Sequence, residues 1–260
     1  MVEIRHSSPA AALFDMTGKV AFVTGASSGL GARFAEVLAA NGARVALAGR
    51  RRDALEARAD LIRSRGGTVE VVDFDVRDHA RIAPAMDAAE AALGPVNVLV
   101  NNAGISGAAK VTDLTLAAWR EILDVDLDAL FLLAREASKR MTRSDVIVNV
   151  SSILALRPKA QMAAYSVAKA GVEHLTRVLA LELGEAGVRV NNLAPGYVVT
   201  GMNAEYFASE ASRPLVAEIP LGRVGQVDDF DGAILYLASD ASRFMTGATL
   251  VVDGGHILAF

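Results

Sequence analysis

The 260-residue sequence contains no cysteine, so disulfides, thiolate metal sites and cysteine nucleophiles are excluded. No apolar run approaches the roughly 20 residues that a membrane-spanning helix needs. The four histidines lack the spacing of metal ligands, and we expect no metal. Basic residues do not exceed acidic ones, 26 against 30, so the chain has no large positive field for nucleic acid. We therefore expect neither a nucleic-acid partner nor a membrane partner.

The rest of the composition is that of a globular protein. Apolar residues make up 52% of the chain and charged residues 22%, close to the roughly 45–50% and 25% of ordinary domains. Residues 1–16 lack the basic start and long apolar centre of a secretion signal, and we interpret them as an N-terminal extension. We expect residues 17–260 to form one domain of a cytoplasmic protein.

Short aliphatic runs alternate with alanine-rich, charged stretches from residue 19 onward. Most of the runs are apolar throughout, as in strands that helices cover on both faces. Strands joined by helices run parallel, so we expect a single-domain α/β Rossmann fold with a doubly wound, seven-stranded parallel sheet. The strands are expected at 19–23, 44–48, 69–73, 96–100, 145–150, 188–193 and 249–252, and the helices at 29–40, 53–65, 78–93, 116–140, 163–185 and 227–238.

One segment breaks this alternation, between the sixth predicted strand and the last predicted helix. Residues 200–220 contain two aromatic residues and two prolines. A long irregular insert in a compact domain is usually functional, so we interpret this one as a substrate lid. A plain surface excursion is the alternative.

A glycine-rich turn, Thr-Gly-Ala-Ser-Ser-Gly-Leu-Gly, follows the first predicted strand and leads into a helix. Glycines let the backbone turn tightly and approach a pyrophosphate, whose charge the N–H groups at a helix start stabilise. A tight connection without a ligand is the alternative. No Gly-Lys-Ser/Thr follows, which excludes a phosphoryl-transfer site. We expect a dinucleotide to bind at Gly25, Ser27, Ser28, Gly29, Leu30 and Gly31.

The end of the second predicted strand indicates which dinucleotide binds. An NAD site needs an acidic residue there for the ribose 2′-hydroxyl, but this strand ends in Gly49 and three arginines. Arg50, with Arg51 beside it, is suited to hold a 2′-phosphate through a bidentate fork. The alternative is that the arginines only solvate a helix start. We expect NADP(H) to be preferred, with NAD(H) possible.

Two further strand ends carry candidate cofactor contacts. Asp75 and Val76 follow the third strand and are candidates for contact with adenine. Asn102, Ala103 and Gly104 follow the fourth, where the chain passes close to a cofactor. Ordinary turn chemistry is the alternative for each.

Ser152, Tyr165 and Lys169 form the candidate catalytic group. A spacing of four places Tyr165 and Lys169 on one face of a helix, and an ammonium beside a phenol stabilises the phenolate. Tyr165 would then give a proton to a carbonyl oxygen as a hydride arrives, or take it from an alcohol in reverse. Ser152 would hydrogen-bond the same oxygen. Alone, Tyr-x-x-x-Lys is a common coincidence on an exposed helix.

Together these motifs resemble the short-chain dehydrogenase/reductase family, and the resemblance runs from about residue 19 to residue 255. It implies a Rossmann fold, hydride transfer between a nicotinamide and a carbonyl/alcohol pair, and a homotetramer built through the two long helices. It also implies that Tyr165 is the acid/base, that Ser152 orients the substrate and that Lys169 also holds the nicotinamide ribose. Further cofactor contacts implied by position are Pro195, Gly196, Val198 and Thr200, with Thr200 at the carboxamide.

One position departs from that family. A fourth catalytic residue, usually an asparagine that holds a water of the proton relay, is here Asp126 in Val-Asp-Leu. An aspartate keeps oxygen acceptors but loses the amide donor, and its charge would keep Lys169 protonated. We expect activity that is retained but altered.

The sequence thus predicts an NADP(H)-preferring carbonyl reductase that acts on a ketone or secondary alcohol. The alternatives are a nucleotide-binding module that has lost catalysis, an epimerase or dehydratase of the extended family, and a 3-oxoacyl or sugar-type substrate. We interpret His256 as a surface residue. An apolar substrate pocket is expected from Leu154, Leu156, Tyr197, Met202, Tyr206 and Phe207.

Overall fold

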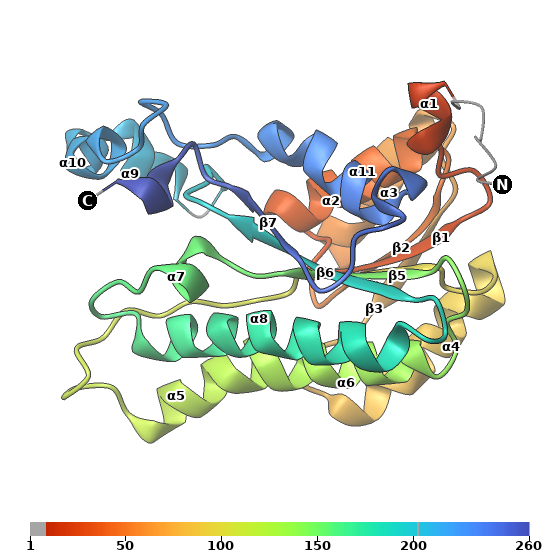
Figure 1. Ribbon diagram of the computed structural model, residues 1–260, viewed down its shortest axis with the longest axis horizontal. Coiled ribbons are helices and arrows are strands. Elements are labelled where there is room, and N and C mark those ends of the chain that lie inside the picture. Colours follow the sequence, from red (N-terminus) through yellow and green to blue (C-terminus); the bar gives the residue numbers. More distant parts are fainter. Residues whose placement is uncertain (1–8, 202, 260) are drawn as a thin grey trace, which may run out of the picture.

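Seven parallel strands form one sheet in the order β3-β2-β1-β4-β5-β6-β7 (Figure 1). The computed structural model describes residues 9–201 and 203–259. The strand order reverses between β1 and β4, and open α/β sheets bind ligands beyond the carboxyl ends of the strands at such a point. The predicted Rossmann fold is confirmed. The strands are β1 (Val20–Thr24), β2 (Arg44–Gly49), β3 (Val69–Asp73), β4 (Val98–Asn101), β5 (Val146–Val150), β6 (Arg189–Pro195) and β7 (Thr249–Val252).

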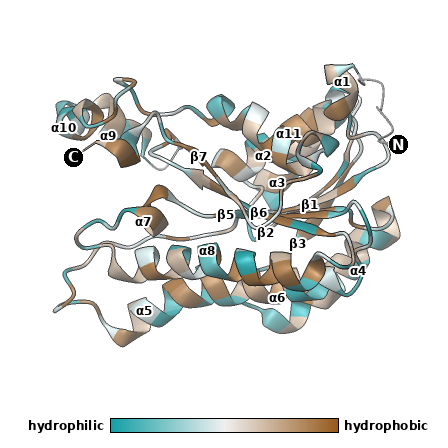
Figure 2. Ribbon diagram, in the orientation of Figure 1, coloured by the Kyte–Doolittle hydropathy of each residue, from teal (hydrophilic) through white to brown (hydrophobic). Residues whose placement is uncertain are grey.

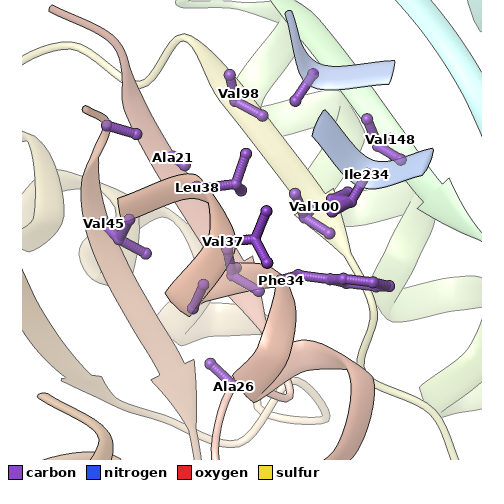
Figure 3. Close-up of a cluster of buried hydrophobic side chains, with 14 of the residues drawn as sticks. Ala21, Ala26, Phe34, Val37, Leu38, Val45, Val98, Val100, Val148 and Ile234 are labelled. Carbon is purple, nitrogen blue, oxygen red and sulfur yellow. The ribbon is translucent and has the colours of Figure 1, made fainter. Parts of the chain in front are cut away.

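Helices cover both faces of the sheet, and each cover has its own buried core. On one face Phe34, Val37 and Leu38 pack on Val98, Val100 and Val148 of the central strands (Figure 3). In Figure 2 the central strands are largely hydrophobic, as a sheet covered on both sides requires. The helices of the first face are α2 (Gly29–Ala40), α3 (Arg52–Ser64) and α11 (Asp231–Ala238), and those of the second are α4 (Ile82–Leu93), α5 (Leu116–Leu123), α6 (Ala129–Ser138) and α8 (Ala163–Leu183).

The helix predicted at 116–140 is interrupted. Between α5 and α6 the backbone forms a π-helical turn, Asp124–Asp128, with Asp126 fully buried at its middle. Such turns are rare and are frequently found at functional sites. The π turn therefore contains Asp126, the residue that stands where the family usually has an asparagine.

The sequence predicted an irregular insert at 200–220, but this segment is largely helical. It contains two one-turn helices, α9 (Ala204–Ala208) and α10 (Arg213–Ala217), with a 3₁₀ turn, Glu210–Ser212, between them. Short 3₁₀ turns also open the helices predicted at 78–93 and 227–238. The remaining helices are α1 (Ala10–Leu13), before β1, and α7 (Ile153–Leu156), after β5.

Near the N-terminus, Met16 is fully buried in the first core although the sequence placed it in the extension. Across residues 9–201 and 203–259, every helix is too short or too polar to cross a membrane.

Candidate active site

Thr24, the last residue of β1, holds the chain that leaves β4. Its Oγ1 accepts hydrogen bonds from the backbone N–H groups of Asn102 and Ala103, both at 3.0 Å. The amide Nδ2 of Asn102 donates back to the carbonyl oxygen of Thr24 at 3.0 Å. The loops that leave β1 and β4 are therefore fixed to each other.

The glycine-rich turn leaves no room for a side chain at Gly25 or Gly31. Gly25 has φ +66°, and a Cβ there would lie 2.8 Å from Nδ2 of Asn102. A Cβ at Gly31 would collide with the carbonyl oxygen of Gly25. Gly29 has φ +58°, and its Cβ position lies 3.4 Å from Cγ2 of Thr200. The start of α2 thus meets both Asn102 and Thr200, and this close-packed cradle fits the pyrophosphate of a dinucleotide.

Arg51 folds back over the glycine-rich turn. Its Nη2 donates to Oγ of Ser27 at 2.9 Å and to Oγ of Ser28 at 2.6 Å. These contacts place its guanidinium at the end of β2, where a ribose would lie if the pyrophosphate occupied the turn. Arg50 lies near by with its side chain 57% exposed, so this edge of the sheet presents two positive charges.

Asp75, after β3, is paired with arginines. Arg77 donates to the Asp75 carboxylate from its backbone N–H at 3.0 Å and from Nη2 at 2.7 Å, and Nη1 of Arg50 lies 3.8 Å away. The hydrogen bonds from Arg77 hold the pKa of Asp75 below its ordinary value. The negative charge of Asp75 therefore anchors Arg77 and Arg50, while Val76 beside it is buried.

The loop after β6 is also fixed. Gly196 packs against Asp253, because a Cβ at Gly196 would lie 2.7 Å from Cα of Asp253. The side chain of Asn203 accepts from the backbone N–H of Thr200 at 2.7 Å and donates to the carbonyl oxygen of Val198 at 2.9 Å. Pro195 ends the strand that precedes this loop.

The candidate catalytic residues lie at the carboxyl end of β5 and the start of α8. Ser152 is buried, and its Oγ accepts from the N–H of Leu154 at 3.1 Å as the N-cap of α7. Tyr165 lies half-buried in the first turn of α8. One turn later, Nζ of Lys169 lies 5.6 Å from the centroid of the Tyr165 ring and donates to the carbonyl oxygen of Val150 at 3.0 Å.

Asp126 forms an ion pair with Lys169. Its Oδ2 lies 3.2 Å from Nζ of Lys169, and its Oδ1 accepts from the backbone N–H of Ile105 at 2.7 Å. Burial disfavours the charged ammonium, but Asp126 and Tyr165 outweigh that cost and raise the pKa of Lys169. Burial also raises the pKa of the Asp126 carboxyl, although Lys169 acts in the opposite direction. Both residues are almost fully buried, so this ion pair is little screened by solvent.

A chain of buried polar side chains anchors α8 to the sheet below Lys169. Asn149 of β5 donates to Oγ1 of Thr176 at 2.8 Å, and Thr176 donates to Oδ1 of Asn192 at 2.7 Å. Nδ2 of Asn192 donates to Oε2 of Glu173 at 2.9 Å. Because buried hydrogen bonds of this kind are costly to break, they fix the helix that carries the candidate catalytic residues.

The structure thus brings Tyr165, Lys169 and Asp126 together, and it brings the glycine-rich turn to Asn102 and Thr200. Sequence reasoning missed the bracing role of Asn203 and the buried chain from Asn149 to Glu173. The buried chain has no local sequence signal, since its members lie on β5, β6 and α8, whereas Asn203 bonds to Val198 and Thr200 within its own loop. The role of Thr24 had one signal, its place at a strand end directly before the turn.

Comparisons with known proteins agree with this geometry. A protein-family model described as enoyl-(acyl carrier protein) reductase matches residues 25–256. The chain belongs to the short-chain dehydrogenase/reductase family, and it is an NAD(P)-dependent oxidoreductase that acts on CH–OH donors.

Its relatives are dehydrogenases of similar length. The cis-4-hydroxycyclohexanecarboxylate dehydrogenase of Sinomonas cyclohexanicum is 41% identical over 248 residues, 92% of this chain and 96% of the relative. The NADP-dependent (R)-specific alcohol dehydrogenase of Lentilactobacillus kefiri is 37% identical, covering 93% and 97%. The crystal structure of a gluconate 5-dehydrogenase from Burkholderia cenocepacia J2315, in complex with NADP and tartrate, superposes with a TM-score of 0.91 at 33% identity, covering 97% and 100%.

Thr24→Val should destabilise the protein, because the N–H groups of Asn102 and Ala103 lose their acceptor. We expect a loss of about 1–3 kcal/mol in the free energy of unfolding, measured by denaturant titration. Thr24→Ser keeps the oxygen and should stay close to the parent. Equal midpoints for the valine and serine variants would contradict this role of Thr24.

Proposed function

We propose that this enzyme transfers a hydride between NADP(H) and a ketone or secondary alcohol, with Tyr165 as the general acid/base. One observation carries the proposal, namely that Lys169 is held between the Val150 carbonyl, Asp126 and the Tyr165 ring. A buried ammonium beside a phenol stabilises the phenolate and so favours proton exchange at the Tyr165 hydroxyl.

In the reducing direction, Tyr165 gives its hydroxyl proton to the carbonyl oxygen, and Ser152 donates a hydrogen bond to that oxygen. The Oγ of Ser152 accepts from the N–H of Leu154, which leaves its own proton available for the substrate. When bound, the nicotinamide supplies or accepts the hydride. In the oxidising direction, Tyr165 takes the proton from the alcohol.

The cofactor would lie along the crevice between the glycine-rich turn and the loops after β2, β3, β4 and β6. The cradle at the start of α2 and the meeting of Gly29 with Thr200 support this path. We assign cofactor binding to Gly25, Ser27, Ser28, Gly29, Leu30, Gly31, Arg50, Arg51, Asp75, Val76, Asn102, Ala103, Gly104, Tyr165, Lys169, Pro195, Gly196, Val198 and Thr200.

The preference for NADP(H) rests on the arginines after β2. Arg51 donates hydrogen bonds to the Ser27 and Ser28 hydroxyls, and the Arg50 guanidinium lies 3.8 Å from the Asp75 carboxylate. Together they offer a positively charged fork for a 2′-phosphate. The relative from Lentilactobacillus kefiri is named as NADP-dependent, and the structure from Burkholderia cenocepacia contains NADP, which supports the same preference here.

We further propose that residues 200–220 cover the substrate and that the protein is a homotetramer. The position of α9 and α10 directly after Thr200 supports the lid. Val167, Val178 and Leu181 recur along one face of α8 and are exposed, as is Phe131 of α6. Exposed apolar faces of this kind mark association surfaces, which supports assembly through the two long helices.

Tyr165→Phe should lower kcat by roughly 10²–10⁴-fold, because a positioned acid contributes a factor of that order. NADPH binding, followed by nucleotide fluorescence, should persist. Tyr236→Phe, on α11, is the matched control and should keep the parental rate. Turnover at the parental rate in the Tyr165 variant would remove the role assigned to it.

Asp126→Asn should move the pH profile of alcohol oxidation to lower pH. The Asp126 carboxylate raises the pKa of Lys169, so without that carboxylate the ammonium loses its proton at lower pH. The fall in activity at alkaline pH should therefore begin at a lower pH than in the parent. The ammonium, no longer opposed by a carboxylate, also stabilises the phenolate at lower pH. Asp128→Asn, on the exposed side of the same turn, is the control. Coincident profiles for Asp126→Asn and the parent, or a move to higher pH, would contradict the assigned ion pair.

Arg50→Asp should shift cofactor preference toward NAD(H), because the new carboxylate repels a 2′-phosphate. Losing a charged hydrogen bond of about 1.5–3 kcal/mol corresponds to a change of roughly 10- to 100-fold in the NADP/NAD ratio of kcat/KM. Arg52→Asp, which introduces the same charge two residues along, should leave the ratio near the parental value. An unchanged ratio in the Arg50 variant would show that another residue determines the preference.

A further inference from the structure

Lys159 lies on the loop between α7 and α8, six residues before Tyr165. Its Nζ donates to the phenol oxygen of Tyr197 at 2.7 Å and lies 5.0 Å from the centroid of that ring. Tyr197 directly follows Gly196 in the loop after β6. The ammonium therefore lies where two segments meet, one leading from Ser152 to Tyr165 and the other leading from β6 into the segment 200–220.

The position of the Tyr197 hydroxyl is fixed by aromatic neighbours. Its ring packs edge-on against Phe207 of α9, with centroids 6.2 Å apart, and in a tilted arrangement against His256 at 5.4 Å. Phe207 packs in turn on Tyr206. His256 is buried, so its prediction as a surface residue is wrong. These ring contacts position the Tyr197 phenol, whose oxygen accepts the hydrogen bond from Lys159.

In the part of the chain that the structure describes, carboxylates do not neutralise the positive charge of this loop. Within residues 9–201 and 203–259, no Asp or Glu oxygen lies within 4.0 Å of Lys159 or Arg157. Arg157 donates to the carbonyl oxygen of His256 at 3.3 Å, and Lys159 to a neutral phenol. Glu218 lies 3.4 Å from Nε2 of His256. Two cations two residues apart therefore remain available to an external anion.

The donors suit a carboxylate in particular. The Tyr197 oxygen accepts from Lys159, which leaves the phenol proton free to be donated elsewhere. The ammonium and the phenol oxygen are 2.7 Å apart, so each can donate to one of two geminal oxygens. Arg157 adds a second positive charge to the same loop.

We propose that Lys159 and the Tyr197 hydroxyl form an anion subsite, with Arg157 beside it, and that the substrate is a secondary alcohol or ketone carrying a carboxylate. This inference rests on the proposed function, because it assumes that the reacting carbon lies at Tyr165. It makes Lys159 a residue that determines specificity without taking part in proton transfer.

The test compares 4-hydroxycyclohexanecarboxylate with its methyl ester, which has the same ring and the same reacting carbon but no charge. With NADP⁺, kcat/KM for the acid should exceed that for the ester by at least tenfold in the parent. In Lys159→Gln this ratio should fall toward one, chiefly through a higher KM for the acid. Lys139→Gln, far from the site at the end of α6, should keep the parental ratio.

The outcomes separate the subsite from the reaction. Turnover of the ester as fast as the acid in the parent overturns the anion subsite but leaves the proposed oxidoreductase intact. A parental ratio in Lys159→Gln overturns the role of Lys159.

A second measurement does not require turnover. Calorimetry of the NADP⁺ complex should show that cyclohexanecarboxylate binds the parent and Lys139→Gln, and binds Lys159→Gln at least tenfold more weakly. Cyclohexanecarboxamide should bind the parent more weakly than the carboxylate does. Absence of carboxylate binding, or equal binding by both lysine variants, overturns the proposal even if no alcohol is oxidised.

Discussion

The charged amine of Lys169 is the group on which the active end of the sheet depends. It is almost fully buried, and it contacts the carbonyl oxygen at the end of β5 and the Asp126 carboxylate. Pairing favours the charged form of a buried amine, so the π-helical turn that brings Asp126 inward stabilises the Lys169 ammonium. Gly104 completes the arrangement, because a Cβ there would lie 3.0 Å from Asp126 Oδ2. One ion pair thus links β5, α8, the π turn and the loop after β4.

The same helix carries Tyr165, the proposed acid/base, so the anchoring of α8 bears directly on the proposed chemistry. The buried chain from Asn149 to Glu173 fixes its middle, and Lys169 fixes its first turns. Before Tyr165 in the sequence, the loop with Lys159 is attached to Tyr197, whose ring packs against Phe207 and His256. Along the chain, Tyr165 therefore lies between Lys169, which is buried and paired with Asp126, and Lys159, which has no carboxylate oxygen within 4.0 Å in residues 9–201 and 203–259. We assign the first to catalysis and the second to recognition.

Much of this was predictable from sequence, because strand–helix alternation, glycine spacing and the Tyr-x-x-x-Lys pair are local patterns. The seven parallel strands, the doubly wound fold and the family were all predicted correctly. Local patterns do not report contacts between distant elements, so the contact of Asn149 with Thr176 and that of Lys159 with Tyr197 were missed. Helical periodicity across residues 116–140 also gives no sign of a π turn. Cytoplasmic location and the tetramer stay predictions.

The central claim is that Asp126 keeps Lys169 charged inside the protein. It is tested most directly by NMR titration of the lysine side-chain carbons, since the chain has only five lysines and Lys169→Met identifies the signal. The account predicts that Lys169 titrates above its ordinary value of 10.5. Loss of its proton well below that value, as expected for a buried amine without a counter-ion, would contradict the account.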